Sequence, residues 1–163
     1  MGEILNADHE YRAHADQHAS LRVWLRLLSC TTRVEDKIRQ KLRESFDITL
    51  PRFDLMAQLE KHPDGLSMGE LSRRMMVTGG NITAIVDQLE KENLVLRQVG
   101  LNDRRSFTVK LTVAGREAFT EMAVAHEEWV ADIFSGLSNN QQSQLYTLLG
   151  AMKKNLQKQE ETS

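Results

Sequence analysis

The chain has 163 residues, of which 40% are hydrophobic, 27% are charged and two are proline, so it is long enough for one compact domain and is not a disordered chain. No apolar run approaches the roughly 18 residues of a membrane span, and the N-terminal residues lack the basic start and apolar stretch of a secretory signal. The single cysteine, Cys30, cannot form an internal disulfide. We therefore expect a cytoplasmic protein in a reducing compartment, with Cys30 as a buried thiol and a redox sensor as the alternative.

The net charge of −2 is distributed unevenly. Residues 67–110 carry seven basic and five acidic side chains, whereas the rest of the chain carries 14 basic and 18 acidic ones. A local basic excess favours contact with nucleic acid, although this one is modest.

The first half of the chain predicts helices of different lengths. Apolar residues from His18 to Phe46 recur at the i, i+3, i+4 spacing of a long helix. Pro51 suits the first turn of a second helix, whose buried side is Phe53, Met56 and Leu59. The turn residues of "HPDG" end that helix.

The next segment predicts a helix-turn-helix. Ser67 and Glu70 have capping-box spacing and start a short helix. Thr78 is the expected N-cap of the following helix, which includes Gly79 and Gly80 in its first turn. The buried face of this second helix is Ile82, Ile85, Val86 and Leu89.

Alternating apolar residues then predict a β-hairpin over residues 94–99 and 107–111, joined by the turn residues "GLNDRR". Thr112 caps a further long helix, and Ser138 opens the last helix with a second capping box. The predicted fold is therefore mainly α with a small β-hairpin wing: a winged helix-turn-helix at 50–112, flanked by dimerisation helices at 18–48 and 113–160 within one domain, 1–163. The alternative is a solitary helical bundle with an added hairpin.

Residues 50–117 closely resemble the MarR (multiple-antibiotic-resistance regulator) family of bacterial transcription factors. The most specific part is the coupled pattern "VDQLEKENLV", then "DRR", then "LT" before a helix. The resemblance implies a winged-helix homodimer that binds a pseudo-palindromic double-stranded DNA operator. We expect a ligand-responsive repressor that has no enzymatic activity, needs no cofactor or metal and does not bind membranes, and the competing class is a DNA-independent helical interaction protein.

The recognition helix supplies the first predicted DNA contacts. Free N–H groups at a positive helix end can face a phosphate, and glycine lets DNA approach closely, with relief of crowding at the turn as the alternative. Asparagine can pair with adenine, and small side chains can touch a thymine methyl group. Ala84 and Gln88 stand where many relatives carry arginine, which puts base readout at these two positions in doubt. The predicted contacts in this segment are Thr78, Gly79, Gly80, Asn81, Thr83 and Ala84.

The resemblance places the remaining predicted DNA contacts in the wing. Arg104 would enter the minor groove, while Asp103 would brace the loop through an ion pair with Arg105, which is also a predicted DNA contact. The alternative is an ordinary solvated charged turn.

An effector site is the last prediction. The "MVTGGN" version of the motif is similar to family members that respond to aromatic acids or their coenzyme A thioesters. Glu35 and His126 interrupt apolar stripes, and a satisfied pair or a dimer contact is their alternative reading. The predicted effector residues are Trp24, Leu28 and Phe53 around the ring, Arg33 and Lys37 at the phosphates, and Glu35 and His126. An ordinary solvated basic face is the alternative for Arg33 and Lys37.

Two other kinds of site carry less weight. His9, His14 and His18 could place two imidazoles four residues apart, a spacing that zinc binding uses in metal-responsive regulators, but a solvated N-terminus is preferred. No phosphate-binding glycine loop, nucleophile elbow or metal-protease helix is present in the sequence.

Overall fold

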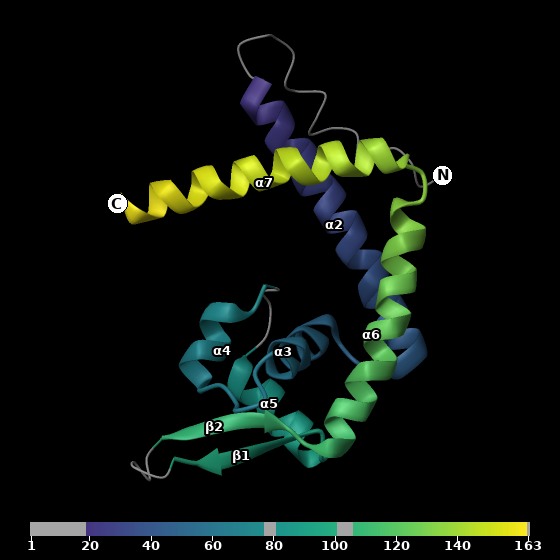
Figure 1. Ribbon diagram of the computed structural model, residues 1–163. Coiled ribbons are helices and arrows are strands. Elements are labelled where there is room, and N and C mark those ends of the chain that lie inside the picture. The colour runs from purple at the N-terminus through teal and green to yellow at the C-terminus, as the bar shows by residue number, and fades with distance from the viewer. Residues whose placement is uncertain (1–18, 77–80, 101–105, 163) are drawn as a thin grey trace. The chain divides into compact units, whose positions relative to one another are not determined.

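The computed structural model describes residues 19–76, 81–100 and 106–162. The chain divides into two compact units, Met1–Val124 and Ala125–Ser163. The elements are α2 (Ala19–Phe46), α3 (Leu50–Glu60), α4 (Met68–Arg74), α5 (Ile82–Lys91), β1 (Val95–Val99), β2 (Phe107–Leu111), α6 (Val113–Phe134) and α7 (Asn139–Glu161) (Figure 1). This order confirms the mainly α fold with a β-hairpin. Among the described helices, none is long and apolar enough to cross a membrane.

The core of the first unit lies among α3, α4, α5 and the hairpin. It is built on α3, which begins with Pro51 in its first turn and buries Phe53, Met56 and Leu59 as predicted. The ring of Phe53 packs against that of Phe119 on α6, with 5.4 Å between their centroids. The largest fully buried side chains are Leu42, Leu55, Met56, Leu59, Leu71, Val86, Leu89, Val95 and Val109.

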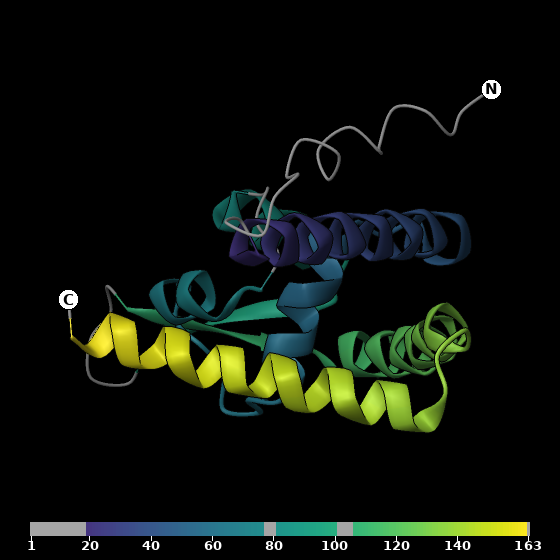
Figure 2. The ribbon, with the colours of Figure 1, turned by 90° about the horizontal axis from the view of Figure 1, so that it is seen from above.

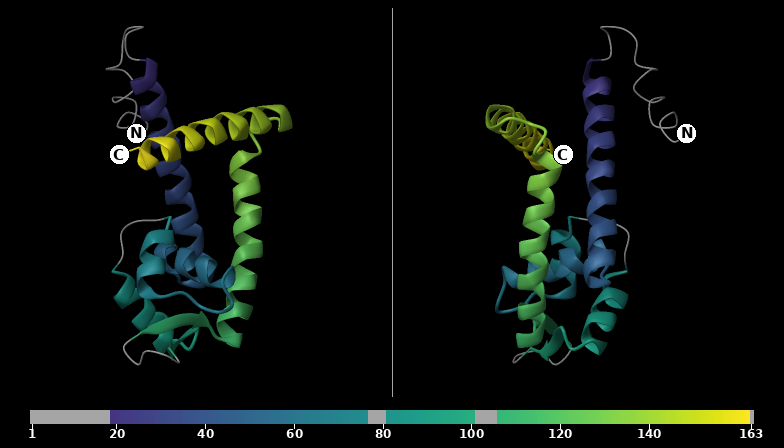
Figure 3. Two further views of the ribbon diagram at one scale, coloured as in Figure 1. Left: turned by 60° about the vertical axis from the view of Figure 1, so that its left-hand side comes forward. Right: turned by 90° about the vertical axis from the view of Figure 1, so that its right-hand side faces the viewer.

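Only the C-terminal part of α2 joins this core, because Ile38 and Leu42 are its buried residues. Figure 3 shows the rest of α2 extending away from α3. Trp24 is 50% exposed and Leu28 43% exposed. Cys30 is also exposed, so the prediction of a buried thiol is wrong for the single chain. The apolar periodicity of α2 is real, but none of the described residues of the first unit buries the apolar side of its N-terminal half.

The hairpin is antiparallel, with Val95 opposite Leu111 and Val99 opposite Phe107. A short bridge joins Leu66 to β2, because each backbone N–H of Leu66 and Val109 donates to the other residue's carbonyl, at 3.0 and 2.8 Å. Gly65 precedes this bridge with a φ of +92°, and a Cβ there would lie 2.9 Å from the Val109 carbonyl oxygen. Glycine is therefore required where the chain passes over β2 into α4.

The start of α6 packs against Asn93 and Leu94, the residues between α5 and β1. As predicted, Thr112 caps the helix, since its Oγ1 accepts the Gly115 N–H at 2.9 Å. The same hydroxyl donates to the Asn93 carbonyl at 2.7 Å. A Cβ on Gly115 would lie 1.8 Å from the Leu94 carbonyl oxygen, so only glycine allows this close approach.

The second unit contains the end of α6 and all of α7, which Figure 2 shows as one unbroken helix. The predicted capping box is present, because Ser138 and Gln141 exchange side-chain-to-backbone hydrogen bonds. The amide of Gln142 donates to the carbonyls of Phe134 and Leu137, at 3.2 and 3.0 Å, which fixes the turn before α7. No described residue of α7 is buried.

Candidate nucleic-acid interface

The first helix of the helix-turn-helix, α4, is set by its capping box. The Ser67 N–H donates to the Glu70 carboxylate at 2.8 Å, and the Glu70 N–H donates to Ser67 Oγ at 3.2 Å. The hydrogen bond from the Ser67 backbone holds the pKa of Glu70 below its usual range. The carboxylate therefore stays ionised at the positive end of α4, where a negative charge stabilises the helix.

The recognition helix α5 begins at Ile82, and Asn81 is its N-cap. The Asn81 side-chain oxygen accepts the N–H groups of Thr83 and Ala84, at 3.0 and 3.4 Å. The prediction that Thr78 caps this helix is therefore wrong, because α5 begins at Ile82 and Asn81 is its N-cap. Thr78 and Asn81 are both good N-cap residues, and the cap falls on the second because the helix starts three residues later than expected.

The exposed side of α5 is the predicted DNA-facing side. Thr83, Ala84 and Gln88 are exposed, while Ile85, Val86 and Leu89 are buried and Ile82 is half-buried. Asn81 is exposed, but its oxygen is engaged in the cap. A bidentate pair with adenine needs that oxygen as an acceptor, so the structure leaves the Asn81 amide group as a donor only.

The wing is fastened to α5 by Arg97 on β1, a residue that the sequence did not single out. Its guanidinium forms ion pairs with Asp87 and Glu90, both on α5. It also lies over the Phe107 ring, 5.5 Å from the centroid. The hydrogen bond that the guanidinium donates to the Asp87 carboxylate, together with the negative charge of Glu90, raises the pKa of Arg97. The hairpin base and the recognition helix are thus joined through one cation that stays charged at any physiological pH.

A buried carboxylate fixes the chain between α4 and α5. Asp54 on α3 is 8% exposed and accepts the backbone N–H of Met76 at 2.8 Å. Met76 is 83% exposed and directly follows Met75, the C-cap of α4, so Asp54 holds the backbone where the chain leaves this helix. Asp54 interrupts an apolar run in the sequence, which was the only available signal of this role.

The remaining predicted DNA contacts lie outside the described residues. They are Thr78, Gly79, Gly80, Arg104 and Arg105, together with the bracing residue Asp103. The N-terminal His9, His14 and His18 also lie outside. Within the described ranges, no group of three or more His, Cys, Asp or Glu side chains is placed to hold a metal ion.

The predicted effector residues lie in different surroundings. Arg33 and Lys37 are exposed on α2, and Glu35 pairs with Arg39 at 3.2 Å. Phe53 is buried, whereas Trp24 and Leu28 are exposed, as described above.

His126 belongs to the second unit and is half-buried. Burial lowers the pKa of His126, and the neighbouring Glu127 carboxylate opposes this shift. Its role in effector binding stays a prediction, as do the roles of the α2 and α3 residues.

Comparison with known proteins identifies the family. Residues 48–107 match the model of the MarR family. The chain is 27% identical over 131 residues to the transcriptional regulator PecS of Dickeya dadantii, a match that covers 79% of each protein.

Solved structures agree with this assignment. The crystal structure of a MarR family transcriptional regulator from Silicibacter pomeroyi is 31% identical, with a TM-score of 0.77, and the match covers 87% of this chain and 99% of that one. The structure of MepR from S. aureus in complex with DNA is 25% identical, with a TM-score of 0.67, and covers 82% of this chain and 96% of that one.

Proposed function

The chain belongs to the MarR family and is a DNA-binding transcriptional regulator, not an enzyme, and from this premise we propose that it is a homodimeric repressor in the cytoplasm. A small aromatic acid or its coenzyme A thioester would release it from a pseudo-palindromic operator. The observation that carries the proposal is the attachment of α5: Asn81 caps its start, and Arg97 joins its side to the wing. A helix held in this way presents its exposed side as a rigid unit, as major-groove reading requires.

The proposal of a dimer rests on apolar surface that the described residues of a single chain leave uncovered. On α7, Leu145, Leu149 and Met152 are between 37% and 41% exposed, and Leu156 is 47% exposed. A soluble chain does not keep a long apolar stripe in water without a partner. A second copy, with the same stripe and the same need, would supply one and would present two equivalent recognition helices to DNA.

Arg104→Ala tests the DNA-binding proposal. A fluorescent duplex from the region upstream of the protein's own gene is titrated with wild type, with the variant and with Arg116→Ala, a charge-matched control on α6. We expect Arg104→Ala to weaken binding by about 1–3 kcal/mol and to lower the salt dependence, because one cation that the wing places in the minor groove is lost. Footprinted half-sites should be centred roughly 10 bp apart.

The contrary outcomes are separable. A footprint without two-fold symmetry would contradict the homodimer. Failure of the wild type to bind any duplex would favour the DNA-independent interaction protein.

The effector proposal has its own test. The protein–duplex complex is titrated with benzoate and with benzoyl-CoA at equal concentrations. Release by the thioester alone, lost in the Arg33→Ala/Lys37→Ala double variant, would support phosphate contacts by Arg33 and Lys37 on α2. Release by benzoate at the same concentration would show that Arg33 and Lys37 are not needed to bind phosphates. Release by a metal or an oxidant, and by neither aromatic compound, would contradict the proposal of an aromatic effector.

A further inference from the structure

Three polar or charged side chains are buried in the described part of the chain, and all three lie on α3. They are Arg52, Asp54 and Gln58, which are between 6% and 8% exposed. The two charged ones contact the chain on either side of α5. Asp54 accepts the Met76 N–H before this helix, and Arg52 forms an ion pair with Glu92, its C-cap. Residues two apart on a helix point about 200° apart, so α3 reaches both ends of the recognition helix from opposite sides.

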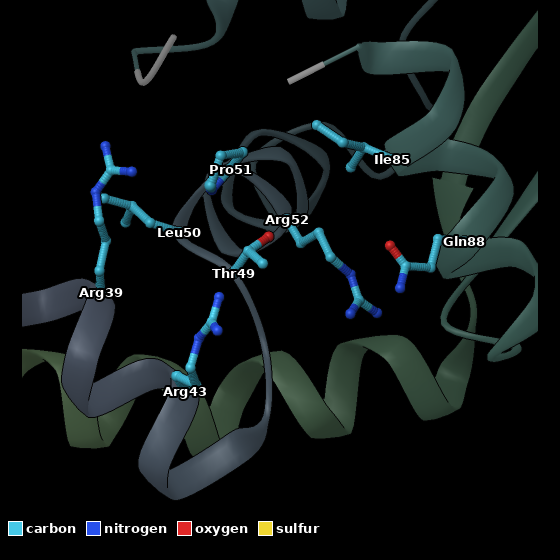
Figure 4. Close-up of a pocket in the computed structure, with 8 residues that line it drawn as sticks. All are labelled: Arg39, Arg43, Thr49, Leu50, Pro51, Arg52, Ile85 and Gln88. Atoms are coloured by element: carbon cyan, nitrogen blue, oxygen red, sulfur yellow. The ribbon is translucent and has the colours of Figure 1, made fainter. Parts of the chain in front are cut away.

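The ion pair joins a buried cation to the last turn of α5. Figure 4 shows the side chain of Arg52 extending from α3 toward the side of α5 that carries Gln88. Glu92 lies one helical turn beyond Gln88, and its N–H donates to the Gln88 carbonyl at 3.2 Å. The side chain of Arg52 is 7% exposed and that of Glu92 is 44% exposed. The buried partner is therefore the one on α3, and the partner on α5 reaches solvent.

This ion pair is a poor source of stability. A buried guanidinium loses its water, and the attraction of one carboxylate often does no more than offset that cost. The Nε–H of Arg52 adds to the cost, because it is buried and has no acceptor within the described ranges. An unbranched apolar side chain such as methionine would fill similar space without either cost. The stability of the fold therefore does not account for an arginine at this position.

The ion pair does supply direction, which the apolar contacts of α5 lack. Ile85, Val86 and Leu89 bury one side of α5, but hydrophobic burial is not directional. We propose that Arg52 is a positioning residue: its ion pair with Glu92 sets the orientation in which α5 meets DNA, without adding to the net stability of the fold. The inference rests on the proposed role of α5 in reading DNA, and the experiment separates the two.

The first measurement is DNA discrimination. Arg52→Met/Glu92→Gln removes the ion pair and leaves the net charge unchanged, and Arg116→Met/Glu117→Gln makes the same exchange on α6 as a control. Fluorescence anisotropy gives the affinity for the upstream duplex and for a shuffled duplex of equal length and composition. We expect the first variant to bind the upstream duplex about tenfold more weakly, the cost of one lost base contact. Binding to the shuffled duplex should not change, because non-specific affinity comes from phosphate charge.

The second measurement is urea unfolding of the same proteins. The midpoint of Arg52→Met/Glu92→Gln should equal or exceed that of wild type, as apolar replacement of a buried ion pair often produces. Arg52→Lys should match wild type in duplex binding, because an ammonium group can still pair with Glu92 and brings no Nε–H. A purely structural role for Arg52 would instead lower the midpoint and weaken binding to both duplexes.

The third measurement reports orientation without DNA. Residual dipolar couplings of the backbone N–H groups of α3 and α5 are recorded by NMR. In Arg52→Met/Glu92→Gln, we expect the couplings of α3 to be unchanged and those of α5 to fit a different or more averaged orientation. The proposal is overturned if the α5 couplings match wild type, if the midpoint falls, or if either Arg52→Lys or the α6 control behaves like this variant. If the α5 couplings change but the preference for the upstream duplex does not, the proposed role of α5 fails while Arg52 still positions the helix.

Discussion

Replacing Asn81 separates a helix cap from a base reader. Its side-chain oxygen accepts two N–H groups at the start of α5, of which the bond to Thr83 at 3.0 Å is the shorter. Asn81→Ala removes this acceptor and should cost about 1 kcal/mol of unfolding free energy, whereas Asn81→Ser keeps an N-cap oxygen and should cost only tenths. Because the helix start presents the DNA-facing residues, we expect duplex affinity to follow capping: nearly unchanged in Asn81→Ser and weaker in Asn81→Ala.

Two measurements on the same variants check this expectation. Urea unfolding followed by far-ultraviolet circular dichroism gives the unfolding free energy, and fluorescence anisotropy with the upstream duplex gives the affinity. A base-reading asparagine predicts something else, because serine cannot reproduce the amide and both variants would lose about 1–3 kcal/mol of discrimination at one base pair. The capping argument is refuted if Asn81→Ser is as stable as wild type yet binds the duplex as poorly as Asn81→Ala.

Three further predictions concern stability. Gly115→Ala should lower the unfolding free energy measured by urea titration by about 1–3 kcal/mol, because its Cβ would lie 1.8 Å from the Leu94 carbonyl oxygen. Gly69→Ala is the control and should be tolerated, because its Cβ would meet only the end of a flexible side chain. Burial lowers the pKa of His126 below its ordinary 6.5, so the unfolded chain binds more protons and stability should fall as pH drops through and below 6.5. Between pH 7.5 and pH 5.5, the unfolding free energy from urea titration should fall less in His126→Gln than in wild type. An equal fall in both proteins would contradict burial of His126 as the cause. The melting temperature should rise with protein concentration if α7 is covered by a second copy, and Leu149→Glu should abolish that dependence.

Local signals in the sequence predicted most of the fold. Ser67 with Glu70, Ser138 with Gln141, and Pro51 each act within one helical turn, so their chemistry is readable without the tertiary structure. The hairpin also followed from alternation. The cap of α5 was placed wrongly because two good N-cap residues stand three positions apart, and only the path of the chain decides between them.

The contacts that position the site could not be predicted in this way. Arg52 and Glu92 are 40 residues apart, and Asp54 and Met76 are 22 apart, so nothing in their neighbourhood in the sequence indicates the pairing. The exposure of Cys30 was missed for a related reason. Helical periodicity shows which side of α2 is apolar, but not whether the chain itself supplies a cover for it.

If a small ligand controls DNA binding as proposed, the attachment of α5 keeps the required free energy modest. Apolar burial of Ile85, Val86 and Leu89 holds α5 against the core without fixing its orientation, because hydrophobic contacts are not directional. Orientation comes instead from polar contacts at its start, side and end. A ligand that binds one orientation about 100-fold more tightly shifts the balance between them by roughly 2.7 kcal/mol. One or two charge-assisted hydrogen bonds, at about 1.5–3 kcal/mol each, supply that difference. The ion pair of Arg52 with Glu92 at the end of α5 is therefore one of the polar contacts that a change in the orientation of this helix would alter.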